Sequence, residues 1–359
     1  MDKALELQDV SKEYKIVRRK AGQGETRLLG LRKLTQFFLG ETFSVLGTRS
    51  VASITALDRV NLSVGPGQVV GLFGKNGSGK TTLLSILGGI FPPDSGQVRC
   101  FGHDLSTQVD QIRQYVVPVF GWLDAITWAF TGRQNIEKFM IMHHVDPALI
   151  ADQIDALARE IEIDERLDDR AARYSQGMRV KIQVMTAILL YRMRGRALLL
   201  FDEPFIGLDV FSQRYLRQFV KYQLRHENFA TILATHQPED IEEVCDEVIV
   251  IDQGRIIAQD SVEALRRRVK KAENIRLEYA SPSGQPLADS FFAQDGVLEC
   301  RSLTRDQVTE VDLLVEDSRA TLSWLVGDLI RAGHQVVSLQ TRAMKFEDVL
   351  VKLIEGEAI

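Results

Sequence analysis

The chain has 359 residues, of which 45% are hydrophobic and 26% charged, and its formal net charge is −5. These proportions exclude a disordered, collagenous or coiled-coil chain, and the length predicts two domains of ordinary size. The mildly acidic balance gives no electrostatic case for nucleic-acid binding.

The cysteines and the apolar runs bear on where the chain works. Cys100, Cys245 and Cys300 lie far apart in the sequence, which predicts free thiols in a reducing compartment. The charged N-terminus lacks the apolar core of a signal peptide, and no stretch of about 20 apolar residues occurs. We therefore expect a chain that does not itself cross a membrane.

The first predicted elements are two strands at 4–10 and 57–64, where apolar and polar residues alternate. An insertion at about 15–55 separates them. Its residues 27–39 carry Leu and Phe near helical spacing, which predicts a short amphipathic helix. The insertion also holds a basic cluster: Arg18, Arg19, Lys20, Arg27, Arg32 and Lys33. Such a helix either packs on its own domain or contacts a membrane surface or partner, and the sequence leaves both readings open.

A glycine-rich loop follows the buried strand predicted at 68–73 and precedes a predicted helix. Residues 74–81, GKNGSGKT, match the pattern GxxxxGK[ST] at every fixed position. Glycines allow the loop to wrap around phosphates with its backbone N–H groups pointing inward. Lys80 can then reach the β- and γ-phosphates, and Thr81 can ligate Mg²⁺. The predicted phosphate-binding residues are Gly74, Lys75, Asn76, Gly77, Ser78, Gly79, Lys80, Thr81 and Thr82.

The middle of the chain alternates helices and buried strands. Asp146-Pro147 predicts a helix start, with one helix at 150–161 and another at 180–191. The apolar runs 197–201 and 231–235 are typical of parallel strands, and 248–259 of a hairpin. Asp202 and Glu203 end the first of these strands, where parallel sheets bind ligands. Asp202 is a candidate Mg²⁺ ligand and Glu203 a candidate general base.

Four further motifs complete a resemblance to the ATP-binding subunit of ABC transporters, over about 1–265. They are the sequence YSQGMR at 174–179, Gly207-Leu208-Asp209, His236 after a buried strand, and Tyr14. The resemblance implies a P-loop NTPase of α/β class with a mixed sheet and a helical subdomain at about 115–190. It implies that Ser175, Gln176 and Gly177 bind ATP held by a second subunit, with Asp209 in the D-loop. It also implies that His236 touches the γ-phosphate, that Tyr14 stacks on adenine, and that Glu203, His236 and Lys80 are catalytic.

Two departures refine the resemblance. The signature is YSQGM rather than LSGGQ, and no glutamine stands at 117–128, where Trp122 and Asp124 are candidate substitutes. Together with the sequence at Thr131–Ile136 and the long insertion, these two departures make the chain resemble one branch of the family. Members of that branch export lipid-linked polysaccharides and teichoic acids.

After a loop at 281–286 the periodicity changes. Strands are predicted at 274–280, 296–302, 309–316 and 335–341, and helices at 319–332 and 346–354. This pattern predicts a small α+β accessory domain at about 270–359. Leu322, Leu325, Leu329 and Ile330 of its first helix are expected to be core.

The leading expectation is an ATPase subunit of an exporter of lipid-linked polysaccharide or a similar glycolipid. It would use ATP and Mg²⁺, pair with a second ATP-binding subunit, and lie at the cytoplasmic face of the membrane against permease subunits. The alternatives are an ABC-2-type exporter of a drug, lipid or peptide, a soluble ABC ATPase that acts on ribosomes or DNA, and a regulatory subunit without turnover. One cassette, no coiled coil and no basic excess disfavour the soluble ATPase.

Overall fold

The computed structural model describes residues 3–18, 50–120, 126–226, 229–269, 273–281, 287, 291–305, 308–343 and 345–355. The predicted helix 27–39 lies outside these described residues, as do Arg19 to Lys33 of the basic cluster and both Trp122 and Asp124. None of the described helices is long and apolar enough to span a bilayer.

A six-stranded sheet forms the centre of the first part of the chain. Its order is β10-β9-β3-β8-β7-β6, and only β10 runs antiparallel to its neighbour. The strands β3, β7 and β8 are buried along their whole length, as expected for a parallel sheet covered on both faces. The bounds are β3 Val69–Phe73, β6 Val116–Phe120, β7 Leu198–Asp202, β8 Ala230–Thr235, β9 Glu247–Asp252 and β10 Arg255–Ser261.

A second, antiparallel sheet has the order β2-β1-β4-β5. Its strands are β1 Leu5–Arg18, β2 Ser50–Val64, β4 Ser95–Cys100 and β5 His103–Asp104. The predicted strands 4–10 and 57–64 were too short, because β1 and β2 stay paired from Leu5 opposite Val64 to Arg18 opposite Ser50. Both ends of the 15–55 stretch therefore belong to this pair of strands. Their charged residues obscure the apolar alternation in the sequence, but cross-strand hydrogen bonds keep the backbone extended.

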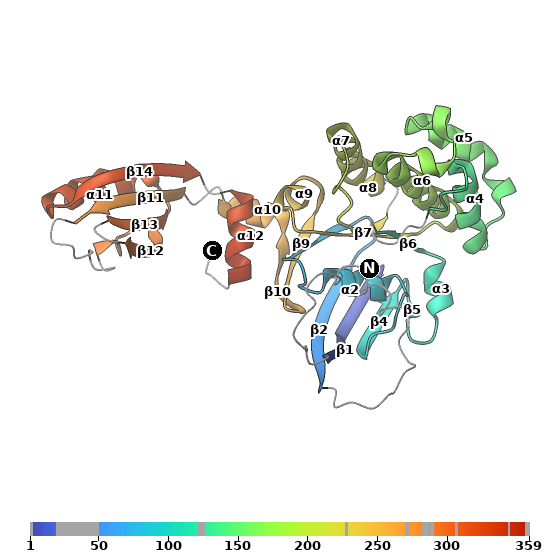
Figure 1. Ribbon diagram of the computed structural model, residues 1–359, viewed down its shortest axis with the longest axis horizontal. Coiled ribbons are helices and arrows are strands. Elements are labelled where there is room, and N and C mark those ends of the chain that lie inside the picture. Colours follow the sequence, from blue (N-terminus) through green and yellow to red (C-terminus); the bar gives the residue numbers. More distant parts are fainter. Residues whose placement is uncertain are drawn as a thin grey trace, which may run out of the picture.

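Three helices gather at the end of the molecule farthest from the C-terminal sheet (Figure 1): α4 Gly132–Met142, α5 Ala151–Glu160 and α6 Gln176–Arg194. Thr131 begins α4 with a capping box, and Asp146 caps the short turn before α5. The predicted helix 180–191 is longer at both ends, because Ser175 caps its start and Gly195 ends it at a φ of 69°. The other α-helices of this part are α2 Lys80–Leu87, α3 Val109–Arg113, α7 Val210–Gln218, α8 Leu224–His226, α9 Pro238–Val244 and α10 Val262–Val269. A π-helical turn covers Phe219–Gln223, and 3-10 turns cover Pro147–Leu149, Asp164–Arg166 and Ala171–Arg173.

The C-terminal part contains a third sheet, with the order β12-β13-β11-β14. Its elements are β11 Glu273–Ala280, β12 Val297–Arg305, β13 Val308–Val315, α11 Ser318–Arg331 and β14 Gln335–Ala343, close to the predicted ranges. Helix α11 supplies Leu325 and Leu329 to a separate core, as predicted, whereas Ile330 is exposed.

The last helix, α12 Phe346–Glu355, lies between this sheet and the first part of the chain (Figure 1). It contacts α9, α10 and β9, and its Phe346, Val349 and Leu350 join the core of the first part. The boundaries 1–265 and 270–359 stay predictions.

Candidate active site

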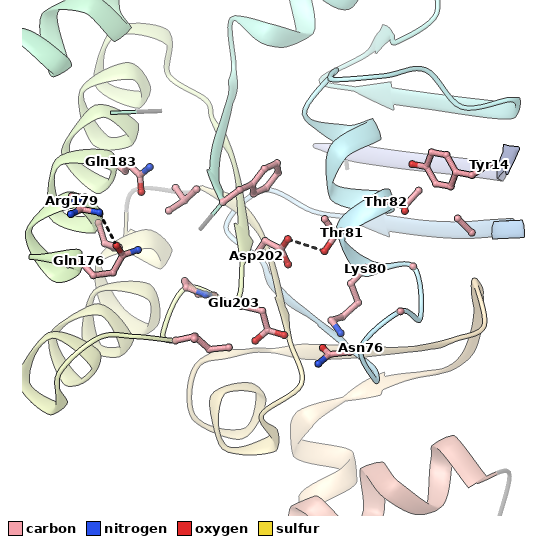
Figure 2. Close-up of a pocket in the computed structure, with 18 of the residues that line it drawn as sticks. Tyr14, Asn76, Lys80, Thr81, Thr82, Gln176, Arg179, Gln183, Asp202 and Glu203 are labelled. Carbon is pink, nitrogen blue, oxygen red and sulfur yellow. Dashed lines mark hydrogen bonds between the residues drawn. The ribbon is translucent and has the colours of Figure 1, made fainter. Parts of the chain in front are cut away.

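A cavity of about 720 Å³ opens between the phosphate loop and helix α6 (Figure 2). It lies at the carboxyl ends of β6 and β7, the edge at which parallel sheets bind ligands. Ten predicted site residues line it: Tyr14, Asn76, Gly77, Gly79, Lys80, Thr81, Thr82, Gln176, Asp202 and Glu203. The other seven do not: Gly74, Lys75, Ser78, Ser175, Gly177, Asp209 and His236.

The phosphate loop wraps around the ammonium group of Lys80. Lys80 Nζ donates to the carbonyl oxygens of Gly74 at 2.6 Å and Lys75 at 3.2 Å. Burial lowers the pKa of Lys80, and the nearby carboxylates of Glu203 and Asp202 oppose that shift. Gly79 has a φ of 112°, a value that favours glycine. It is the N-cap of α2, and the N-terminus of that helix faces the cavity. Together, a cation and a helix N-terminus fit the phosphates of a nucleotide.

Thr81 and Asp202 bring two oxygen donors together beside this loop. Thr81 Oγ1 donates to Asp202 Oδ2 at 2.9 Å, and the carboxylate is buried. Figure 2 shows the pair close to Lys80 and Glu203. Hydroxyl and carboxylate oxygens are the ligands that Mg²⁺ prefers, so the donor set fits the predicted metal.

Glu203 and His236, 33 residues apart in sequence, form a close pair. Glu203 Oε1 lies 2.7 Å from His236 Nδ1, and Thr235 Oγ1 donates to Glu203 Oε2 at 3.2 Å. The backbone of Glu203 has a φ of 51°, and its N–H donates to the Ala234 carbonyl. This left-handed turn at the end of β7 aims the carboxylate at the cavity instead of along the strand.

Tyr14 lines the cavity on the side opposite Glu203 (Figure 2). Its ring meets Phe91 edge-on, with the ring centroids 6.1 Å apart. Burial raises the pKa of the Tyr14 hydroxyl, and a hydrogen bond with Thr82 opposes the shift. The half-buried ring offers a flat surface on which an adenine could stack.

Ser175 and Gly177 of the signature and Asp209 of the D-loop lie near one another and do not line the cavity, whereas Gln176 of the same signature does. Ser175 Oγ accepts from the Met178 N–H, and Asp209 accepts from the N–H groups of Phe211 and Ser212. The Ser212 hydroxyl also holds the pKa of Asp209 below its usual range. A Cβ at Gly177 would lie 2.3 Å from Ser212 Oγ, so the signature glycine lets α6 pack directly on α7.

Among the lining residues to which sequence reasoning gave no role are Trp128, Arg179 and Gln183. The Arg179 guanidinium lies over the Trp128 ring at 4.1 Å and donates to the Tyr174 carbonyl. The spacing of Gln176, Arg179 and Gln183 places all three on one face of α6. That helical spacing was the signal, but it becomes informative only once the face of α6 toward the cavity is known.

Comparison with known proteins matches residues 57–206 to the family model "ABC transporter". The chain is 31% identical over 225 residues to the ABC transporter ATP-binding protein YdbJ of Bacillus subtilis. The aligned region covers 62% of this chain and 70% of YdbJ. It is 28% identical to the daunorubicin resistance ATP-binding protein DrrA2 of Streptomyces coeruleorubidus, over 83% of this chain and 90% of DrrA2. It is 24% identical to the bacitracin transport ATP-binding protein BcrA of Bacillus licheniformis, over 87% and 96%.

Among solved structures, the dimeric ATP-binding cassette MJ0796, bound to ADP and Pi, superposes with a TM-score of 0.53 at 17% identity. That match covers 72% of this chain and 98% of MJ0796 and shows a shared fold. The predicted ABC-type P-loop fold is therefore confirmed. The family match, the similarity to YdbJ and the order of the motifs agree: the chain belongs to the ABC transporter family, as an ATP-binding subunit that is an ATPase.

Proposed function

We propose that the chain powers an ABC exporter of drug-like or antibiotic-like compounds, with Glu203 as the base that activates the attacking water. The observation that carries the hydrolytic role is the 2.7 Å contact between Glu203 Oε1 and His236 Nδ1 beside the phosphate loop. The same contact argues against a regulatory subunit without turnover, because the base and its partner are already assembled.

The substrate class rests on two relatives that resemble the chain over 83% and 87% of its length. The names of DrrA2 and BcrA refer to daunorubicin resistance and bacitracin transport, and both similarities extend well beyond the cassette. The expectation of a polysaccharide exporter finds no support in these names. We therefore favour the alternative in which an ABC-2-type exporter moves a drug-like molecule.

Catalysis would proceed mainly by positioning and charge neutralisation. The N–H groups of the loop and Lys80 would bind the phosphates, and Tyr14 would hold the adenine. Thr81 and Asp202 would hold Mg²⁺, which when bound neutralises charge on the phosphate oxygens. Glu203 would accept a proton from the attacking water, while His236 holds the carboxylate in place.

The exposed start of α7 supports a second copy as partner. Ile206, Val210 and Phe211 are 48%, 77% and 86% exposed, beside Asp209. Large apolar side chains gathered on a surface mark an interaction site. A second copy placed there would bring its own Ser175 and Gly177 to the nucleotide, since these residues do not line the cavity of their own chain. The remaining partner would be an integral membrane permease, with the chain at the cytoplasmic face of the membrane.

Glu203→Gln tests the hydrolytic role. The amide keeps the shape of the side chain but cannot take the proton, so we expect ATP binding within about threefold of wild type and a turnover at least about 100-fold lower. The variant should accumulate as an ATP-bound dimer in size-exclusion chromatography. Glu239→Gln, an exposed carboxylate on α9, is the matched control and should keep wild-type turnover. Undiminished hydrolysis by Glu203→Gln would contradict the proposal.

The substrate class needs a test in cells. The chain would be expressed with the membrane protein that co-purifies with it, and efflux of daunorubicin and resistance to bacitracin would be measured against the Glu203→Gln form. ATP-dependent efflux or resistance supports a drug exporter. Flipping of a lipid-linked polysaccharide instead would restore the glycolipid expectation, and co-purification with ribosomes or DNA would favour a soluble ABC ATPase.

A further inference from the structure

A buried polar cluster lies directly behind the Glu203–His236 pair. Thr235, the last residue of β8, and Asp240, in the first turn of α9, are each 1% exposed. Arg217 of α7 donates to Asp240 Oδ1 from Nε at 3.0 Å and from Nη2 at 2.7 Å. The cluster therefore ties α7 and α9 to the end of β8, next to the carboxylate of Glu203.

The Thr235 hydroxyl has a single proton but faces two carboxylates. Its Oγ1 lies 3.2 Å from Glu203 Oε2 and 3.2 Å from Asp240 Oδ2. The N–H of Gln237 donates to the same oxygen at 3.0 Å and holds the hydroxyl between the two acceptors. Because a hydroxyl donates one hydrogen bond at a time, it can serve only one of them fully.

Arg217 determines which of the two carboxylates accepts the hydrogen bond from Thr235. Its two N–H bonds compensate the charge of Asp240, so that carboxylate attracts a further donor less strongly. Burial raises the pKa of Asp240, an effect that the bonds from Arg217 and Thr235 oppose. With its charge compensated by Arg217, Asp240 leaves the hydroxyl proton of Thr235 to Glu203.

Building on the proposed function, we infer that Thr235 is a positioning residue for Glu203. His236 holds Oε1 and Thr235 holds Oε2, so both oxygens of the carboxylate are fixed. A carboxylate held by one bond can rotate about its last torsion, whose energy wells are broad. Since misplacement of a reacting group by about 1 Å costs about 100-fold in rate, the second bond should raise turnover rather than ATP affinity.

Thr235→Val tests this inference, because valine keeps the shape and loses the hydroxyl. We expect kcat for ATP hydrolysis at least about 10-fold lower, with KM and the Kd for ATP within about twofold of wild type. Thr235→Ser, which restores the hydroxyl, should recover at least half of kcat. If valine prevents folding, Thr235→Ala removes the same hydroxyl and takes its place in the comparison.

Thr231→Val is the matched control. Thr231 lies in the same strand, is fully buried, and its Oγ1 has no hydrogen-bond partner among the described residues. Replacing such a group by an isosteric apolar one is close to neutral, so kcat and the thermal midpoint should stay at wild-type values.

Asp240→Asn separates positioning from a structural role of Thr235. If Thr235 serves Glu203, Asp240→Asn should keep kcat within about threefold, because Glu203 remains as an acceptor. An equal loss of kcat in Asp240→Asn and Thr235→Val would overturn the inference, as would a Thr235→Val protein that loses thermal stability while keeping kcat. Full turnover by Glu203→Gln would refute the proposed function itself. Loss of turnover in Glu203→Gln together with an active Thr235→Val would refute only the positioning role.

Discussion

Gly79 shows how a single residue shapes the phosphate loop. A Cβ at this position would lie 2.5 Å from the Ala56 carbonyl oxygen and 3.0 Å from Leu57 Cδ2, and the backbone is left-handed. We expect Gly79→Ala to lower the free energy of unfolding by about 2–4 kcal/mol, from the left-handed backbone and the clash together, and to weaken ATP binding. Urea unfolding and nucleotide titration measure the two effects.

Gly102→Ala is the control for that substitution. Gly102 is also left-handed, at a φ of 83°, but a Cβ there would meet nothing within 4 Å. It should cost only about 1 kcal/mol and leave ATP binding intact. Equal losses in the two variants would show that the close approach to Ala56 carries no weight.

At the residue scale, the sequence predicted the site residues that belong to short motifs, but not the residues that hold those side chains in place. Lys80, Thr81, Asp202 and Glu203 follow from local spacing, because a loop or a strand end places them without reference to distant chain. Thr235, although it is adjacent to His236, gives no signal of its own. Its role depends on Asp240 and Arg217, which only the packing of α7 against α9 brings into reach.

Arg133 links helix α4 to helix α5 and to the turn that holds Asp168. From α4 it donates to Asp155 of α5 and to Asp168, each at 2.8 Å. All three side chains are partly exposed, so we expect Arg133→Met to lower the free energy of unfolding by only about 1 kcal/mol at pH 7. Urea unfolding checks this value, and Arg159→Met, on the exposed face of α5, should change it by less than about 0.5 kcal/mol.

The same ion pairs predict a pH dependence. The hydrogen bond from Arg133 holds the pKa of Asp168 below its usual value of 3.8. The stabilisation is therefore complete above that value and disappears as the pH falls through the lower pKa of the folded state. The difference between wild type and Arg133→Met should stay constant from pH 7 to about pH 5 and shrink below about pH 3.5. A difference that grows in acid would contradict this origin.

Element boundaries were predictable where a cap or a turn marks them. Asp146-Pro147 and the hairpin at 248–259 are correctly placed, because their signals are local. The length of β1 and β2 was not predictable, since Lys12, Glu13 and Lys15 interrupt the apolar alternation. These residues stay extended because β2 pairs with them, and pairing between distant segments leaves little trace in either one alone.

At the scale of the whole molecule, the pattern of α12 was predictable but its surroundings were not. Helical spacing shows that one face of residues 346–354 is buried, not which surface covers it. In the structure, Phe346, Val349 and Leu350 share a core with Ile241 and Val244 of α9. The C-terminal end of the described chain thus packs on the helix that carries Asp240 and follows His236.

This placement predicts where damage to α12 should appear. Leu350 is fully buried, so Leu350→Ala should lower the free energy of unfolding by about 2–4 kcal/mol, and Val351→Ala, at a site 41% exposed, by well under half of that. Because Leu350 packs in the core that contains α9, hydrogen exchange should speed up in 238–244 before it changes in α11. Faster exchange in β11 to β14 with α9 unchanged would show that α12 supports the C-terminal sheet instead. The expected result would make the C-terminal helix a structural support for the segment that holds Thr235, His236 and Asp240.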